Sequence, residues 1–422
     1  MKIWIKSARI IDPDSPHHNK KRDILIESGK ITRIGTNLNP RGAEKLEADN
    51  LHVSPGWFDM QAFVPDPGHE YKENLASACN AAMRGGFTGI ALLPDTHPPR
   101  DSKSDIEYVI NQCKSYLVDV HPYGAVSEGL KGENLTEMHD MKQAGAVGFT
   151  DGKHPVSNGN LQRLALQYSK DFGGLILSFP FEKNIAGKGI AHEGPVATSL
   201  GMATIPVLSE ELMVNRDIYL AQYTGSRIHF STLSAKSASE LVKNARQKGT
   251  QVTAGVAAHH LLLTEDALSD FDSNAKVIPP FRSKSDRDAM RKAVAQGIID
   301  VICSDHWPED QDEKRKEFDL AAFGAVGFET AFAAAWTALE KTADLATVIK
   351  ALSANPRRIL GLAQPVVDEG QQANLTLFNP NHLWQVEEKQ LASRSKNSPF
   401  LQQELKGKAL GAINKGQVHW VG

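Results

Sequence analysis

The chain has 422 residues, of which 41% are hydrophobic and 23% are charged, and its formal net charge is −3. These values are typical of a globular protein with room for one large and one small domain, and they give no electrostatic reason to expect a nucleic-acid partner. No apolar run reaches the roughly 18 residues of a membrane span, so we expect no membrane partner. The chain contains only three cysteines, which lie far apart. Together with the absence of a signal-peptide pattern, this predicts a cytoplasmic protein.

Short β-prone segments occupy both ends of the chain. Near the start they include residues 2–5, 23–26 and 31–34, and near the end residues 373–378 and 416–421. The segments alternate with turn residues, as strands of a small sheet do. Because similar segments flank a different middle, we predict a discontinuous β-sandwich domain built from residues 1–54 and 365–422.

The middle of the chain alternates apolar runs with amphipathic stretches, which predicts an α/β protein. The stretches at 72–84, 161–170, 210–223, 237–248 and 285–296 have apolar residues three or four apart, as helices do. This alternation predicts a (β/α)₈ barrel over residues 55–364. A doubly wound open sheet is the alternative, but no G-x-G-x-x-G follows a first strand. The eight β-prone runs lie near 52–63, 87–94, 118–126, 146–151, 174–180, 227–233, 251–258 and 299–305.

Short motifs recur in order along this barrel region. The frame Pro55-Gly56-x-x-Asp59 with Pro67-Gly68 resembles the end of the first barrel strand in dihydroorotases of the amidohydrolase superfamily. The resemblance covers nearly the whole chain. Its further motifs are Gly85-Gly86-Phe87-Thr88, Pro94-Asp95-Thr96-His97, Gly148-Phe149-Thr150-Asp151, Arg216-Asp217-Ile218, Pro279-Pro280-Phe281-Arg282, Ser304-Asp305-His306 and Asn397-Ser398-Pro399-Phe400.

The first strand of this family carries His-x-His, which binds a catalytic zinc, followed by an Arg that binds the substrate carboxylate. The corresponding positions here are Gln61, Phe63 and Pro65. An amide is at best a weak zinc ligand, and a phenyl ring or a proline is none. The resemblance therefore implies a site whose first two metal ligands and first substrate contact are lost.

The later strands repeat this pattern. The family's two further histidine ligands correspond to Pro180 and Thr232, so all four histidines are missing. A bridging carboxylate is retained as a vestigial Asp151, beside Gly152 where the family has a second acid. The family's catalytic aspartate is retained as Asp305. We predict that the chain holds no zinc.

Positions that bind substrate in the family also differ. Besides Pro65, a family Asn reads Asp95, which would repel an anionic substrate, and another reads Ile278. His306 is retained, so Asp305 and His306 are predicted to be vestiges of a catalytic site. We interpret the pair His259-His260 as structural, because neighbouring residues of a strand point to opposite faces. His121 is expected at the surface.

These substitutions predict a protein that is not an enzyme. The resemblance implies an inactive dihydroorotase-like homologue, a pseudoenzyme that is a structural or regulatory partner of the catalytic chain of aspartate carbamoyltransferase in pyrimidine biosynthesis. It would form a homodimer within a larger hetero-oligomer. One alternative is an active metal-dependent cyclic amidohydrolase with a degenerate metal site, built from Asp151, Asp305, His154 and His306. The other is a binding module that holds a small ligand at the barrel mouth, lined by Phe63, Ile278 and Trp307.

Overall fold

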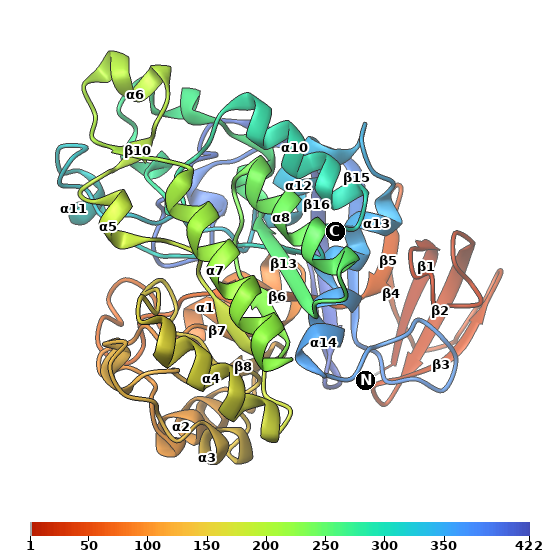
Figure 1. Cartoon of the computed structure of the whole chain (residues 1–422). Helices are drawn as coiled ribbons and strands as arrows, with labels where there is room; N and C mark the ends of the chain where they lie inside the picture. Colours follow the sequence, from red (N-terminus) through yellow and green to blue (C-terminus); the bar gives the residue numbers. More distant parts are fainter. Residues whose placement is uncertain (1) are drawn as a thin grey trace.

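Parallel strands from the middle of the chain form a closed barrel in the computed structural model, which describes residues 2–422 (Figure 1). One three-stranded and one four-stranded parallel sheet make most of it. Phe149 bridges the two sheets on one side, through Gly124 and Ile176, and Ala62 pairs with His306 on the other. The strands are β6 (Trp57–Ala62), β7 (Phe87–Leu92), β8 (Asp119–Pro122), β9 (Ile176–Ser178), β12 (Ile228–Phe230), β13 (Val252–Ala257) and β14 (Val301–Cys303).

Helices surround these strands, as in other (β/α)₈ barrels. Several begin at side-chain caps: Asn74 and Ser77 form a capping box at α1, and Asn158 caps α4. The longer helices are α1 (Leu75–Arg84), α2 (Lys103–Cys113), α4 (Gly159–Asp171), α7 (Leu208–Thr224), α8 (Lys236–Gln247), α10 (Lys284–Ala295), α12 (Ala331–Leu339), α13 (Leu345–Leu352) and α14 (Ala354–Leu360). Shorter ones are α3 (Met138–Gln143), α5 (Lys183–Ala186), α6 (Pro195–Leu200), α9 (Ala258–Leu262) and α11 (Gln311–Lys314).

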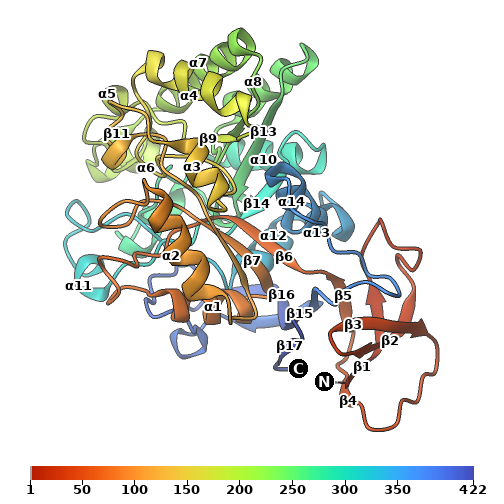
Figure 2. The ribbon, with the colours of Figure 1, turned by 90° about the horizontal axis from the view of Figure 1, so that it is seen from below.

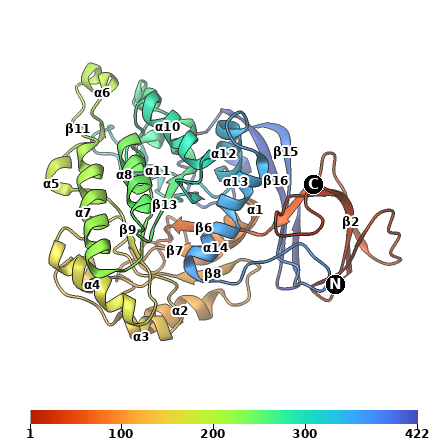
Figure 3. The same cartoon turned by 45° about the vertical axis from the view of Figure 1, so that its right-hand side comes forward.

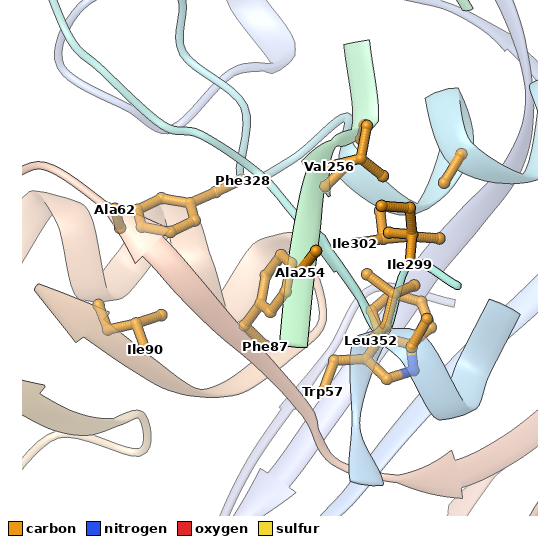
Figure 4. Packing of buried hydrophobic residues seen from close by; sticks show 14 of the residues in the cluster. Trp57, Ala62, Phe87, Ile90, Ala254, Val256, Ile299, Ile302, Phe328 and Leu352 are labelled. Atoms are coloured by element: carbon orange, nitrogen blue, oxygen red, sulfur yellow. The ribbon is translucent and has the colours of Figure 1, made fainter. Parts of the chain in front are cut away.

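The largest core cluster lies between the barrel strands and these helices. Trp57, Phe87 and Phe328 are fully buried there, together with aliphatic side chains of β13 and β14 such as Val256 and Ile302 (Figure 4). Most of these strands, such as β6, β7, β9, β12 and β14, are buried on both faces, which explains why the apolar runs in the sequence are nearly continuous. This core fixes the strand ends, where the candidate site lies.

A second sheet stands beside the barrel and contains both ends of the chain (Figures 2 and 3). Its order is β17-β16-β15-β5-β1-β2-β3, with β4 paired to β1. Isoleucines and leucines from both halves, such as Ile5, Ile24 and Leu377, share one core of their own. The bounds are β1 (Lys2–Ile10), β2 (Lys21–Glu27), β3 (Lys30–Gly35), β4 (Glu44–Leu46), β5 (His52–Pro55), β15 (Leu375–Gln385), β16 (Glu404–Asn414) and β17 (Gln417–Trp420), while β10 (Ala191–His192) and β11 (Thr204–Ile205) form a separate pair.

The predicted α/β barrel is confirmed. The β segments of the two ends, predicted to form a sandwich, pair within one sheet of eight strands, and the run at 146–151 contributes only the isolated bridge residue Phe149 rather than a strand. The run at 52–63, interpreted as one strand, is two strands in different sheets, β5 and β6. Gly56 joins them, and a Cβ there would lie 2.0 Å from atoms of Asn374 and Thr88. Only glycine allows the chain to pass this closely from one sheet to the other. Across residues 2–422, no helix combines the length and the apolarity needed to cross a membrane.

Candidate functional site

The candidate site is the mouth of the barrel, where the strands end and family sites of this fold lie. Asp305 follows β14 and is fully buried, with a left-handed backbone (φ 49°). A non-glycine residue in this region is uncommon and is often found at functional sites. Its Oδ1 has no hydrogen-bond partner. The retained aspartate is thus held in a special conformation at the centre of the mouth.

Lys153 is the cation in contact with Asp305. Its Nζ donates to Asp305 Oδ2 at 2.9 Å and to the carbonyl oxygen of Ile278 at 2.8 Å. It also lies 4.9 Å from the ring centre of Trp307. Burial raises the pKa of Asp305, whereas Lys153 and the amide of Gln61 lower it. Lys153 was not among the predicted site residues, although a lysine directly after a predicted barrel strand was the available signal.

Gln61 and Phe63 replace the two histidines of the first strand. The Gln61 side chain is buried, and neither of its amide atoms makes a hydrogen bond of normal geometry, although it lies close enough to Asp305 to stabilise its charge. Phe63 stacks on Trp307, with ring centres 4.1 Å apart and planes inclined by 25°. The mouth is therefore closed by an aromatic pair where the family has a metal ligand.

The side chain of Asp95 fills the space next to Gly152 at the mouth. Asp95 Oδ2 accepts the backbone N–H of Lys153 at 2.9 Å. A Cβ at Gly152 would lie 1.5 Å from Asp95 Oδ1. Burial raises the pKa of Asp95 to about 6. The carboxylate of Asp95 thus fills the room that a side chain at 152 would need, so these two departures from the family pattern are physically linked.

Asp151 is hydrogen-bonded to the loop at Val126 and Ser127. Its Oδ1 accepts the backbone N–H groups of Val126 and Ser127, at 2.8 and 2.9 Å, and its Oδ2 accepts the hydroxyl of Ser127. Burial raises the pKa of Asp151 to about 6. Both oxygens are used to hold a loop, so Asp151 is not free to bridge metal ions in this arrangement.

Thr232 and Pro180 are buried after β12 and β9, and the Thr232 hydroxyl has no hydrogen-bond partner. Pro65 lies after β6, where its carbonyl oxygen accepts the N–H of His69. Ile278 contributes its carbonyl to Lys153, and its side chain packs beside Phe179 and Phe181. None of these side chains offers a nitrogen or a carboxylate for a metal ion.

The histidines near the mouth lie differently from our expectation. His259 and His260 belong to helix α9 rather than a strand, so the argument from strand alternation was wrong, and their ring centres are 4.6 Å apart. His259 Nε2 lies 3.8 Å from Asp305 Oδ2 and has no hydrogen-bond partner, while His260 contacts the carbonyl oxygen of Pro279. Burial lowers the pKa of His259 well below its usual value, so its ring is neutral.

His306 is retained, and its Nε2 lies 3.7 Å from Glu73 Oε2. Its ring stacks on Phe328 at 4.0 Å, and its Nδ1 accepts the N–H of Gly327. His154 has a half-exposed side chain whose Nε2 lies 3.9 Å from Asp95. His121, expected at the surface, lies in β8 with its ring 5.4 Å from that of Phe58. The four residues of the degenerate metal site, Asp151, Asp305, His154 and His306, therefore do not converge.

Zinc, which the family resemblance implies, does not fit the residues present. Over residues 2–422, no three His, Cys, Asp or Glu side chains are grouped so that they could hold a metal ion. The hollows of about 250 to 500 Å³ found on the described chain are lined by other residues than those of the mouth. The unpaired polar atoms of Gln61 and His259 nevertheless lie beside the pair formed by Asp305 and Lys153. A buried polar set of this kind can bind or transfer protons, but it cannot coordinate zinc tightly.

Comparisons with known proteins identify the chain's relatives. Residues 51–238 match the model of the dihydro-orotase-like family, and residues 209–418 match the amidohydrolase family. A dihydroorotase of Geobacter sp. (strain M21) is 40% identical over 99% of both chains. One of Pelotomaculum thermopropionicum is 41% identical over 99% of this chain and 98% of its own. The fold is shared with the L-hydantoinase of Arthrobacter aurescens, with a TM-score of 0.86 at 22% identity over 99% of this chain and 95% of that one.

These relatives correct our functional prediction. We predicted that the chain is not an enzyme, because the family's histidine ligands are missing. Relatives of nearly full length at about 40% identity carry the name of an enzyme, which contradicts that prediction. We equated the loss of the metal ligands with a loss of activity, but these substitutions concern only metal binding. By full-length similarity to these proteins, the chain belongs to the dihydroorotase family of the amidohydrolases.

Proposed function

We propose that this chain acts at the dihydroorotase step of pyrimidine biosynthesis, the interconversion of carbamoyl aspartate and dihydroorotate. The observation that carries the proposal is the retention of Asp305 at the end of β14, buried and with a free Oδ1 in the barrel mouth. The full-length similarity to proteins named dihydroorotase supports it.

The reaction needs a group that carries a proton. In the hydrolytic direction, water forms a C–O bond to the ring carbonyl carbon, the C–N bond breaks, and one proton moves from the water to the departing nitrogen. Asp305 is suited to accept and return this proton, because its Oδ1 has no hydrogen-bond partner and burial raises the pKa of its carboxyl above the ordinary value. For substrate to reach it, the Phe63–Trp307 pair must open.

The test is an assay of purified chain, treated with a chelator, in both directions of the reaction. We expect turnover above background that Asp305→Asn abolishes and that the exposed control Asp270→Asn leaves unchanged. Circular dichroism of both variants separates loss of activity from loss of fold. No turnover by the folded wild-type chain, alone or with the transferase described next, would refute the proposal.

We also propose that the chain assembles with the catalytic chain of aspartate carbamoyltransferase. The support is the resemblance to homologues that do so, together with the chemistry, because carbamoyl aspartate is made by the transferase and is consumed at this step. Mixing the two purified chains of the same organism should give one earlier peak in size-exclusion chromatography and a faster carbamoyl transfer. Unchanged elution and unchanged rate at micromolar concentration would contradict the assembly.

A further inference from the structure

We infer that Lys153 is a built-in cation that takes the charge role of the family's zinc at the barrel mouth. Its ammonium group lies 2.9 Å from Asp305 Oδ2, and both side chains are almost fully buried, 7% and 2% exposed. The pairing of the Lys153 and Asp305 charges does not depend on whether the proposed reaction occurs.

A buried carboxylate needs a nearby positive charge, because removal of an ion from water is costly. The neighbours of Asp305 other than Lys153 do not provide it. His259 has a neutral ring, and Gln61 is an uncharged amide. His306, whose charge would also lower the pKa of Asp305, has its Nε2 3.7 Å from the carboxylate of Glu73, which balances that charge. The Lys153 ammonium is therefore the direct counter-charge of Asp305, as a divalent ion would be in a metal site.

Residues that depart from the family pattern are the ones that hold Lys153 in place. Phe63 stacks on Trp307, whose ring lies 4.9 Å from the ammonium. The carbonyl oxygen of Ile278 accepts from Nζ, and the carboxylate of Asp95 accepts the backbone N–H of Lys153. The substitutions that remove zinc ligands and substrate contacts thus form one cluster of contacts around Lys153. Unrelated losses would not converge in this way.

The test uses metal analysis and a double-mutant cycle on the full chain. Dialysed wild-type protein should retain no zinc, and added zinc or chelator should leave its melting temperature unchanged. Lys153→Met should lower the melting temperature by about 5–10 °C, because Asp305 is left buried without its counter-charge. The double variant Lys153→Met/Asp305→Asn should recover most of that loss.

The exposed pair Lys103 and Glu107, 3.8 Å apart, is the matched control and should show no coupling when mutated to Met and Gln. If Lys153→Met does not fold, the double variant still tests the pairing, because it has no buried charge without a partner and should therefore fold. One zinc retained per wild-type chain, or additive effects of the two mutations, would overturn the inference. Neither measurement depends on catalytic turnover, so it can fail separately from the proposed function.

A second, independent observation concerns the outer face of α7. Four large apolar side chains are strongly exposed there, between 46% and 69%, and spacings of four or seven residues place them on one side of the helix. They are Leu208, Leu212, Tyr219 and Tyr223. We propose that this face, with α8 beside it, binds a second copy of this chain in an antiparallel two-fold arrangement.

The face is complementary to itself. A hollow of about 360 Å³ beside the first half of α7 is lined by Leu212, Glu211 and Glu240. One of about 500 Å³ beside the second half is lined by Tyr219 and Lys248. Antiparallel packing brings the acidic hollow of one copy onto the basic hollow of the other, and leucines onto tyrosines. Two-fold dimers require such a self-complementary patch.

Sedimentation velocity of the full chain over a range of concentrations tests this arrangement. We expect a dimer that Glu240→Lys weakens at least tenfold and that the charge exchange Glu240→Lys/Lys248→Glu restores. Leu320→Glu, at a position 69% exposed outside the face, is the control and should leave the dimer intact. A monomeric wild-type chain at all concentrations would refute it. A monomer that dimerises only with the transferase would assign the face to that partner and equally refute the second copy.

Discussion

The terminal sheet and the barrel mouth treat their buried polar groups differently. In the sheet, Asp23 accepts two backbone N–H groups, from Ser7 at 2.8 Å and Leu38 at 2.7 Å. At the mouth, both amide atoms of Gln61 and the Thr232 hydroxyl have no partner, whereas in the sheet strands the unpaired buried atoms are ring nitrogens of Trp4 and His419. Buried polar groups are normally paired, and exceptions are common at functional sites. The contrast is that unpaired carboxylate and amide atoms gather at the mouth, whereas the buried carboxylate of Asp23 in the sheet is paired.

The largest effect is expected for the pH dependence of stability that Asp59 causes. Asp59 lies in β6, one of the strands at which the barrel closes. Burial raises the pKa of its carboxyl to about 7, so the folded chain keeps the proton that the unfolded chain releases above about 3.8. Its contribution to stability is therefore full below pH 3.8 and is lost as the pH rises to about 7, on the order of 4 kcal/mol in total.

Asp59→Asn removes this loss. Urea unfolding at pH 4.5 and pH 8 should show the variant gaining relative to the wild type as the pH rises. Asp95 and Asp151 titrate in the same range in both proteins and cancel in the difference. Parallel stabilities of the two proteins over this range would contradict the assignment.

Crowding at the mouth predicts the next largest effect. Gly152→Ala should cost about 3 kcal/mol, because its Cβ would overlap Asp95 and its φ is +60°. Gly173→Ala is the matched control, since it has a similar φ of +66° but open space around it, and should cost only about 1 kcal/mol. Equal losses in thermal or urea unfolding would show that Asp95 does not occupy this space.

A core change in the terminal sheet should have an ordinary effect. Ile24 is fully buried in the sheet's own core, and Ile24→Val should cost about 1 kcal/mol for the lost methyl group. Activity at the mouth should not change. A large loss of activity with this variant would mean that the sheet and the mouth are coupled.

The smallest effect is expected at a surface ion pair of the sheet. Lys2 and Glu27 are 3.2 Å apart and about 40% exposed. Lys2→Ala should cost no more than about 0.5 kcal/mol, because water already screens both charges. The contrast with Lys153→Met would show that burial, rather than the pairing itself, decides the contribution of an ion pair.

The pattern of apolar runs and amphipathic stretches predicted the barrel, since periodicity depends only on which faces are buried. The boundary at Gly56 was missed although Pro55-Gly56 is a dipeptide typical of a break, because β-prone residues continue on both sides of it. The α9 helix was also missed. Five residues after an apolar strand carry too little periodic signal to separate a helix from a longer strand.

The sequence by itself determined the family, the barrel and the absence of the four histidines, because these depend on residue identity and order. Only the tertiary structure decided that Asp151 faces Ser127, that Asp95 fills the space beside Gly152, and that Lys153 meets Asp305. The residues of that pair are 152 positions apart. Their contact depends on the closure of the barrel, which brings strand ends together irrespective of their distance along the chain.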